Sequence, residues 1–253
     1  MLKVYLDNNI IISIENGEYG IDRILKLFPS DQIQLFYSSA HIFEIQHFEG
    51  NSKISKADLL AKRFETIRRL FANNYLYIDL KGGNIVNIIE DPFEVYKTIT
   101  QVSFAIPSIK VFSSLFTKDQ KESFQQEIGI ESKLLNNYSA TDVVAHLNAK
   151  VLDWSFAQSI VDIIEYGVQQ YPKDWNMGLG NRITGIFELL DMFGYWMDKE
   201  TSTSNYARLW DSQHTHFASH CDYFVCNDKR ARNKAKVAYS IYDCKTQMIS
   251  PFE

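Results

Sequence analysis

Proline, cysteine and long apolar runs are all scarce in this chain of 253 residues. With 5 prolines and no low-complexity tract, the sequence is not that of a disordered chain. No stretch of about 18 apolar residues is present, and Asp7 breaks the N-terminal apolar run, so we expect neither a membrane span nor a signal peptide. The three cysteines form no CxxC pair, which argues against a structural zinc site. We therefore expect a folded chain with reduced thiols in the cytoplasm.

The balance of charge and apolar content narrows the class further. A net charge of −5 is not that of a protein that coats nucleic acid through bulk charge, although it leaves room for a local basic rim beside an acidic site. Hydrophobic residues make up 45% of the chain and aromatic residues 14%, which is enough to fill a core. The length suits one large domain or a domain with an insertion.

The N-terminal stretch predicts a buried strand that ends in a carboxylate. Val4, Tyr5 and Leu6 form an uninterrupted apolar run, typical of a strand covered on both faces, and Asp7 follows directly. In open α/β sheets, ligands bind at the carboxyl ends of the strands. Asp7 is therefore a candidate site residue, while the alternative is that it only caps a helix beginning near Asn9.

The two ends of the chain alternate between strands and helices, whereas the middle has a helical period. Further strands are predicted at 32–37, 75–80, 223–226 and 246–249, and helices at 9–16, 21–28, 39–48, 55–73, 206–220 and 228–238. Between about 85 and 204 the helical patterns are 88–101, 107–117, 119–137, 139–171 and 183–198. The fold class is therefore α/β, with 1–84 and 205–253 as one discontinuous domain and 85–204 as an all-helical insertion.

Three more acids lie where predicted elements meet. Glu44 falls early in the helix that follows the second strand, Asp211 lies near the start of a helix, and Asp228 follows the strand 223–226. Asp222 precedes that strand, so we expect it at the opposite edge of the sheet. Clustered carboxylates repel one another, which makes an open acidic cluster a candidate cation site.

These junctions resemble the motifs of PIN-domain ribonucleases. Leu6-Asp7-Asn8-Asn9-Ile10 is similar to the opening strand and its Asp-x-Asn, with Asn8 where Thr or Ser is usual. Ser38 to Glu44, Asp211 with His214 and Ala218, and Cys226-Asn227-Asp228 are similar to the other acidic motifs, with Cys226 in place of Thr. The resemblance covers about 1–80 and 205–253. It implies a three-layer α/β/α sandwich with a mainly parallel sheet.

The same resemblance implies a metal-dependent endoribonuclease of toxin or defence type. Mg²⁺ and Mn²⁺ prefer hard oxygen ligands, so Asp7, Glu44 and Asp228 are the expected metal ligands, with Asp211 serving a second metal or its waters. RNA is the expected substrate, DNA is possible, and an antitoxin or regulatory protein is a possible partner. The oligomeric state is left open.

Four polar residues beside the acids are candidates for binding substrate: Asn8, His214, Lys229 and Arg230. Each has an ordinary alternative. Asn8 could cap a helix, and His214 and His216 could be surface residues that, two positions apart, do not both face inward. The basic run from Lys229 to Lys236 could be a solvated helix face or a rim that holds a nucleic-acid backbone.

Two other functions compete with a nuclease. One is a catalytically weak PIN-like module that binds RNA or a partner protein, and it would show gaps in the acid set. The other is a haloacid-dehalogenase-like phosphatase, which also opens on a strand ending in Asp. That class expects Asp-x-Asp, whereas position 9 is Asn9.

Overall fold

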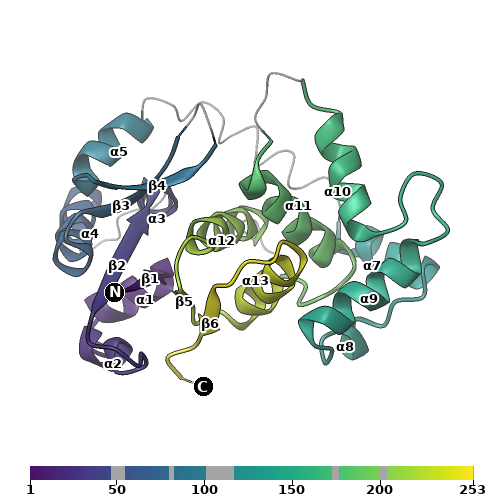
Figure 1. Ribbon diagram of the computed structural model, residues 1–253, viewed down its shortest axis with the longest axis horizontal. Helices are drawn as coiled ribbons and strands as arrows, with labels where there is room; N and C mark the ends of the chain where they lie inside the picture. Colours follow the sequence, from purple (N-terminus) through teal and green to yellow (C-terminus); the bar gives the residue numbers. More distant parts are fainter. Residues whose placement is uncertain (47–54, 80–82, 101–116, 173–176, 200–203, 253) are drawn as a thin grey trace. The chain divides into compact units, whose positions relative to one another are not determined.

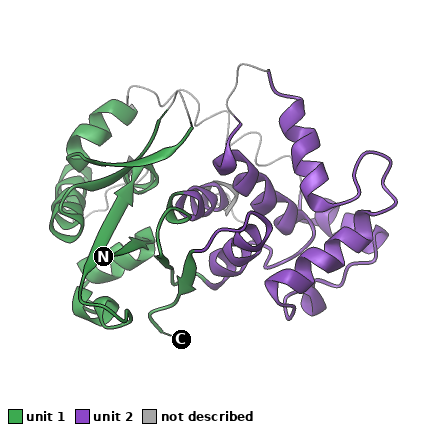
Figure 2. Cartoon of the chain, viewed as in Figure 1, with its two compact units in different colours: residues 1–104, 217–228, 246–253 green, residues 105–216, 229–245 purple. Residues whose placement is uncertain are grey.

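The computed structural model divides the chain into two compact units (Figure 2). It describes residues 1–46, 55–79, 83–100, 117–172, 177–199 and 204–252. Unit 1 comprises Met1–Phe104, Phe217–Asp228 and Thr246–Glu253, and unit 2 comprises Ala105–His216 and Lys229–Lys245. The chain thus leaves each unit and returns to it, so neither is continuous in sequence.

Unit 1 is built on a six-stranded sheet (Figure 1). The strands lie in the order β4 (Ile85–Ile89), β3 (Asn74–Ile78), β2 (Ile33–Ser38), β1 (Leu2–Leu6), β5 (Tyr223–Val225) and β6 (Gln247–Ile249). Every neighbouring pair is parallel except β3 and β4. The predicted α/β class with a mainly parallel sheet is therefore confirmed.

The first strand is internal and buried on both faces, as its composition predicts. Val4 and Leu6 belong to the main apolar core of unit 1, while Tyr5, on the other face, is also fully buried. The same holds for β2, where Leu35 joins this core and Phe36 is buried on the opposite side. An apolar run without alternation is what a strand covered on both faces requires.

Five helices accompany these strands in the described part of unit 1. They are α1 (Asn8–Glu15), α2 (Ile21–Leu25), α3 (Ser39–Gln46), α4 (Lys56–Phe71) and α5 (Pro92–Thr100). Two of them have boundaries that the sequence signals. Asp7 caps α1, and Gly17 follows that helix with φ of 72°. Ser55 caps α4 by accepting a hydrogen bond from the Asp58 amide.

One element of unit 1 was predicted wrongly. The region from 85 onward was expected to be helical, but Ile85–Ile89 is a strand that pairs antiparallel with β3, and the helix begins only at Pro92. The stretch is rich in β-branched residues, which suit a pleated strand. A short apolar run of this kind does not separate strand from helix by period alone.

Unit 2 contains helices in the order α7 (Lys118–Glu127), α8 (Ser132–Leu135), α9 (Ala140–Val151), α10 (Ile160–Gln169), α11 (Leu179–Met192), α12 (Ser204–Ala218) and α13 (Lys229–Ile241). The last two residues of α12 already belong to unit 1. Most of α12 and all of α13 thus group with the central helices, whereas the sequence assigned them to the α/β domain. Of the predicted helix 107–117, residues 107–116 lie outside the described residues.

No helix in the described ranges is both long and apolar enough to cross a membrane. The three cysteines are free, as expected. Cys221 and Cys226 are buried, and Cys244 is half-buried.

Candidate functional site

Three neighbouring parallel strands of unit 1 bring their acid-bearing ends to one edge of the sheet. β1 lies between β2 and β5, with Tyr5 opposite Phe36 and Leu6 opposite Val225. Asp7 follows β1 directly, Asp228 lies three residues beyond β5, and Glu44 lies in the helix that follows β2. We call Asp7, Glu44 and Asp228 the acidic edge. The three strands therefore end side by side, with Asp7 in the middle, and the sharing of one site by the three acids stays a prediction.

The carboxylate of Asp7 is buried and accepts hydrogen bonds from the two residues that follow it in the chain. Its Oδ1 accepts a hydrogen bond from the Asn8 amide at 2.9 Å, and its Oδ2 accepts one from the Asn9 side chain at 3.4 Å. Asp7 is also the N-cap of α1, so the capping role that the sequence allowed is confirmed. These bonds fix the orientation of a side chain that is only 3% exposed.

Cys226 supplies a third donor to Asp7. Its Sγ lies 3.3 Å from Asp7 Oδ2 and 3.7 Å from the carbonyl oxygen of Asp228. In the motif that this turn resembles, Cys226 stands in place of a threonine. The thiol occupies that place as the donor, and it joins the end of β1 to the turn that carries Asp228.

A fully buried group of polar side chains lies just before the acidic edge. His41 Nδ1 accepts from the Ser38 amide at 3.0 Å, so its Nε2 carries the proton and donates to the Leu6 carbonyl oxygen at 2.8 Å. Tyr5 Oη lies 2.6 Å from Ser38 Oγ. His41 therefore ties the end of β1 to the junction between β2 and α3.

Tyr5 lies within electrostatic reach of two of the acids. Burial raises the pKa of Tyr5 well above its ordinary value, the hydrogen bond with Ser38 opposes the rise, and the negative charges of Asp7 and Glu44 add to it. Both carboxylates thus lie within electrostatic reach of one phenol. Sequence reasoning missed Tyr5 and His41 as supporting residues, since a histidine on a helix gives no signal of the backbone groups it will bind.

Asn8 has a structural partner. Its side-chain oxygen accepts from Arg63 at 2.8 Å, and Arg63 also pairs with Glu15 at 2.6 Å. Asn8 is 5% exposed and Arg63 4% exposed. An arginine on a helix of this length ordinarily lies on a solvated face, but Arg63 is buried by these two partners. The expected contact of Asn8 with substrate remains a prediction, although its oxygen is engaged by a guanidinium that links α1 to α4.

The acidic edge offers the right kind of ligand for Mg²⁺ or Mn²⁺, because all three groups are carboxylates. In the part of the chain that the structure describes, however, no three His, Cys, Asp or Glu side chains gather closely enough to hold a metal ion. The three carboxylates are therefore suitable ligands for Mg²⁺ or Mn²⁺, and they follow neighbouring strands of one sheet. To share one ion, they would have to turn toward one another.

Asp211 and His214 lie on α12 within unit 2, whereas the acidic edge belongs to unit 1. The joining of Asp211 to the other acids remains a prediction. His214 and His216 are 1% and 5% exposed, so the expectation that they are surface residues was wrong. Both are buried because helices flank α12 on two sides. Ser212 contacts Thr184 of α11, and the Thr215 carbonyl accepts from Tyr239 of α13.

The basic run at the start of α13 divides into exposed and buried residues. Lys229 is exposed, with its Nζ 4.9 Å from the centre of the Trp196 ring, and Arg230 is half-buried. Arg232 and Lys234 are 4% and 1% exposed. The interpretation of the run from Lys229 to Lys236 as a rim of five exposed basic residues is therefore wrong. For Lys229 and Arg230, contact with substrate stays a prediction.

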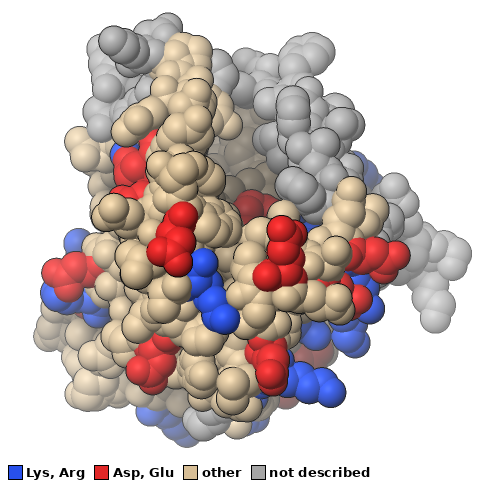
Figure 3. Space-filling model, turned by 90° about the vertical axis from the view of Figure 1, so that its right-hand side faces the viewer, with Lys and Arg blue, Asp and Glu red and all other residues tan. Residues whose placement is uncertain are grey.

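Lys234 belongs to a buried ion-pair network in unit 2, which we call the charge network. Its cations are Lys121, Arg208 and Lys234, and its anions are Asp191, Asp198 and Glu188. Asp191 lies at the centre, 2.5 Å from Lys121 and 3.2 Å from both Arg208 and Lys234. The network joins α7, α11, α12 and α13. On the face drawn in Figure 3, by contrast, acidic and basic side chains are interspersed among uncharged ones.

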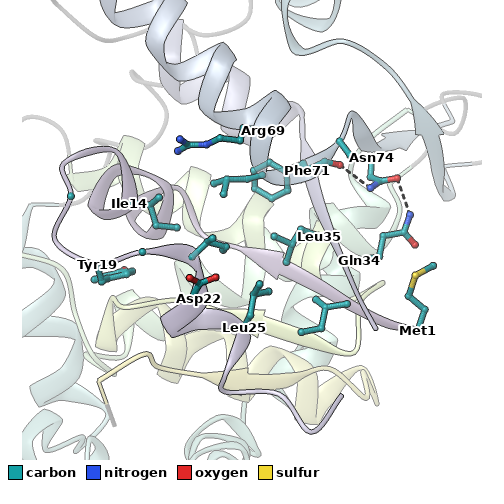
Figure 4. Close-up of a pocket in the computed structure, with 16 residues that line it drawn as sticks. Met1, Ile14, Tyr19, Asp22, Leu25, Gln34, Leu35, Arg69, Phe71 and Asn74 are labelled. Atoms are coloured by element: carbon teal, nitrogen blue, oxygen red, sulfur yellow. Dashed lines mark hydrogen bonds between the residues drawn. The ribbon is translucent and has the colours of Figure 1, made fainter. Parts of the chain in front are cut away.

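One cavity in the described part of unit 1 lies away from the acids. A cavity of about 800 Å³ is bounded by the first residues of β2, the ends of α1 and α4, and α2. Apolar side chains such as Ile14, Leu25 and Leu35 line it, with Arg69 and Asp22 on opposite walls (Figure 4). These elements meet at the amino ends of the strands, whereas the acidic edge follows their carboxyl ends.

Asp222 lies at that amino-terminal edge, as predicted. Its Oδ2 accepts from the backbone amide of Lys3 at 2.8 Å, and its own amide donates to the Lys3 carbonyl. Asp222 is thus a carboxylate of the same sheet on the side opposite the acidic edge.

Comparisons of the chain with protein-family models, with curated proteins and with solved structures find no match. The assignment of a function therefore depends on the residues and the topology described above.

Proposed function

We propose that the acidic edge hydrolyses phosphodiester bonds with the help of Mg²⁺ or Mn²⁺, and that RNA is its substrate, with DNA as the alternative. One observation carries the proposal: three adjacent parallel strands end at one edge, and each is followed by a carboxylate. Ligand sites of open α/β sheets lie at this edge. The order and spacing of the acids resemble those of PIN-like nucleases, with a three-layer sandwich and an added helical part.

Each acid has a distinct place in this proposal. Asp7, Glu44 and Asp228 hold the metal, which when bound activates water and neutralises charge that builds on the phosphate. Asn8, Asn9 and Cys226 hold the Asp7 carboxylate in place, so Glu44 and Asp228 would turn toward it to share an ion. Asp211 supports a second metal or its waters, and His214, Lys229 and Arg230 contact the substrate. A toxin or defence role, held in check by a partner protein in the cytoplasm, fits such an activity.

The test is metal-dependent cleavage and stabilisation in wild type and Asp7→Asn. Labelled RNA and DNA are incubated with Mn²⁺, with Mg²⁺ and with EDTA, and thermal melts are recorded with and without Mn²⁺. Wild type should cleave RNA only with metal, and Mn²⁺ should raise its melting temperature because the ion binds only the folded state. Asp7→Asn should lose activity by orders of magnitude and lose most of the Mn²⁺-induced shift.

The matched control is Asp222→Asn, which removes a carboxylate from the opposite edge of the same sheet. It should keep both the activity and the metal-induced shift. If Asp7 only caps α1, Asp7→Asn changes stability without altering any metal effect. An Mn²⁺-induced shift that is equal in wild type and Asp7→Asn would overturn the proposal.

A binding module without strong catalysis is the second candidate. The specific observation in its favour is that both oxygens of Asp7 already accept hydrogen bonds from protein donors. RNA binding that persists in EDTA, together with no cleavage in either metal, would select this function. The same incubation therefore separates the two.

A further inference from the structure

The strand β4 forms one edge of the sheet in unit 1 (Figure 1). It is the last strand on its side, and among the described residues no strand pairs with its outer edge. Val86, Ile88 and Ile89 are 42%, 37% and 69% exposed, and Tyr77 of the neighbouring β3 is 37% exposed. Exposed apolar side chains on an edge strand mark a surface that pairs with another chain.

The backbone of β4 shows which of its groups point outward. Glu90 donates to the Asn73 carbonyl, and Asp79 donates to the Asn84 carbonyl. Inward bonds in an antiparallel pair recur at every second residue, so Val86 and Ile88 are bonded to β3. The N–H and C=O groups of Ile85, Asn87 and Ile89 therefore point away from the sheet.

This edge lacks the features that keep edge strands apart. Natural proteins protect such strands with a lysine, a proline, a bulge or an inward charge. The stretch Ile85-Val86-Asn87-Ile88-Ile89 contains no charged residue and no proline, and its pairing with β3 runs without interruption over all five residues. Nothing in β4 itself opposes the addition of another strand.

The sequence of β4 is nearly symmetric about Asn87, with a β-branched apolar residue at each matching position, and this pattern suits a second copy of the same strand as the partner. We propose that β4 pairs antiparallel with β4 of a second copy of this chain, with the two-fold axis beside Asn87. In that register Ile85 faces Ile89 of the second copy, and Val86 faces its Ile88. A two-fold interface requires a surface complementary to itself, and here branched apolar residues meet on both faces of the extended sheet.

The outward backbone groups fit the same register. Ile85, Asn87 and Ile89 are symmetric about Asn87, so each outward-facing residue meets another and exchanges two hydrogen bonds with it. At the axis the side-chain amides of the two Asn87 residues can also form a hydrogen bond with each other. At the ends Asn84 meets Glu90 of the second copy, so no like charges oppose one another.

The test is the molar mass of the full chain in solution, by light scattering over a range of concentrations. Wild type should pass from 29.4 kDa to twice that mass as the concentration rises. Asn87→Lys places two ammonium groups face to face at the axis and should raise the dissociation constant by about tenfold or more. Asn84→Lys, which meets Glu90 of the second copy, is the matched control and should still dimerise.

A cross-linking arm tests the register itself. Antiparallel bonded residues have Cα atoms about 5.5 Å apart, within disulfide range, so Asn87→Cys should give a dimer that a thiol reductant dissolves. Asn84→Cys should not, because the two introduced thiols would lie about 20 Å apart. A single-chain mass for wild type at every concentration, a dimer that survives Asn87→Lys, or cross-linking at Asn87→Cys no greater than in wild type would each overturn the proposal.

Discussion

Two backbone groups beside the acidic edge depend on one imidazole ring. The Ser38 amide and the Leu6 carbonyl are buried, and both bond to His41, which is 0% exposed. Replacement of His41 by Leu should lower the free energy of unfolding by about 2–5 kcal/mol, because a buried polar group left unsatisfied costs about 1–3 kcal/mol. Urea denaturation of wild type and the variant measures the difference.

His220 provides the control for this prediction, since it is an exposed histidine of the same unit. His220→Leu should change the unfolding free energy by no more than about 0.5 kcal/mol. If His41→Leu were as stable as His220→Leu, the two buried bonds of His41 would contribute nothing, contrary to their geometry.

Individual residues differ in how far their roles could be predicted. Asp7 was predictable because a carboxylate directly after an apolar run must lie at a strand end. Arg63 was not, because its spacing on α4 is equally that of a solvated face. It is buried only because Asn8 and Glu15, both on α1, happen to face it. Such pairings join residues far apart in sequence, so a single helix carries no signal of them.

At the level of elements, the charge network stabilises the arrangement of four helices in unit 2. Burial alone would raise the pKa of Asp191, but Lys234, Arg208 and Lys121 outweigh it and hold the pKa well below its ordinary value. A carboxyl group whose pKa is lowered on folding stabilises the protein above its ordinary pKa, about 3.9, and loses that effect as the pH falls.

Asp191→Asn should therefore destabilise the protein most at neutral pH. We expect a loss of about 3–5 kcal/mol at pH 7, because the variant leaves buried cations without their central partner. The gap between wild type and variant should narrow as the pH falls below about 4, because Asp191 then takes up a proton in the unfolded wild type while it stays ionised in the folded protein. Denaturant unfolding at a series of pH values measures the difference in unfolding free energy between the two proteins.

The contrasting case is Asp243→Asn. Asp243 also forms an ion pair, with Lys245, but both side chains are more than four-fifths exposed. Its replacement should cost at most about 1 kcal/mol at any pH. Equal losses for the two variants would mean that burial of the charge network has no energetic consequence.

The elements that the sequence predicted best are those with a clear boundary signal. The helix after β1 ends at Asn16 and Gly17 as expected, and Ser55 caps α4. β4 was missed because its five residues are too few for a period to show, and its partner strand decides its conformation. The burial of Lys234 on α13 was not predicted, because a run of basic residues ordinarily forms a solvated helix face. Its partner Asp191 lies on α11, far away in sequence.

For the molecule as a whole, the charge network determines whether the central helices can be deleted without loss of the fold. Arg208 and Lys234 come after the central helices in sequence, but their partners Asp191 and Asp198 lie before them. A variant in which a short linker replaces residues 105–199 should therefore lose cooperative unfolding, because two buried cations lose their anions. Circular dichroism during a thermal melt measures the cooperativity of unfolding.

The same deletion with Arg208→Met and Lys234→Met tests the reason. If unpaired charge is the cause, these apolar replacements should restore part of the cooperative transition. A deletion variant that melts cooperatively at the wild-type temperature without them would show that unit 1 does not depend on the charge network.

The pairing of β1 with β5 also has a consequence for the order of events during synthesis. Cys226 donates to an Asp7 that precedes it by 219 residues. At roughly 5–20 residues per second, the ribosome needs on the order of 10–40 s to make the chain between them. During that interval β1 can pair with β2, but its other edge stays open, and the acidic edge lacks Asp228. A nascent chain is thus unable to carry out the proposed hydrolysis beside the messenger that encodes it.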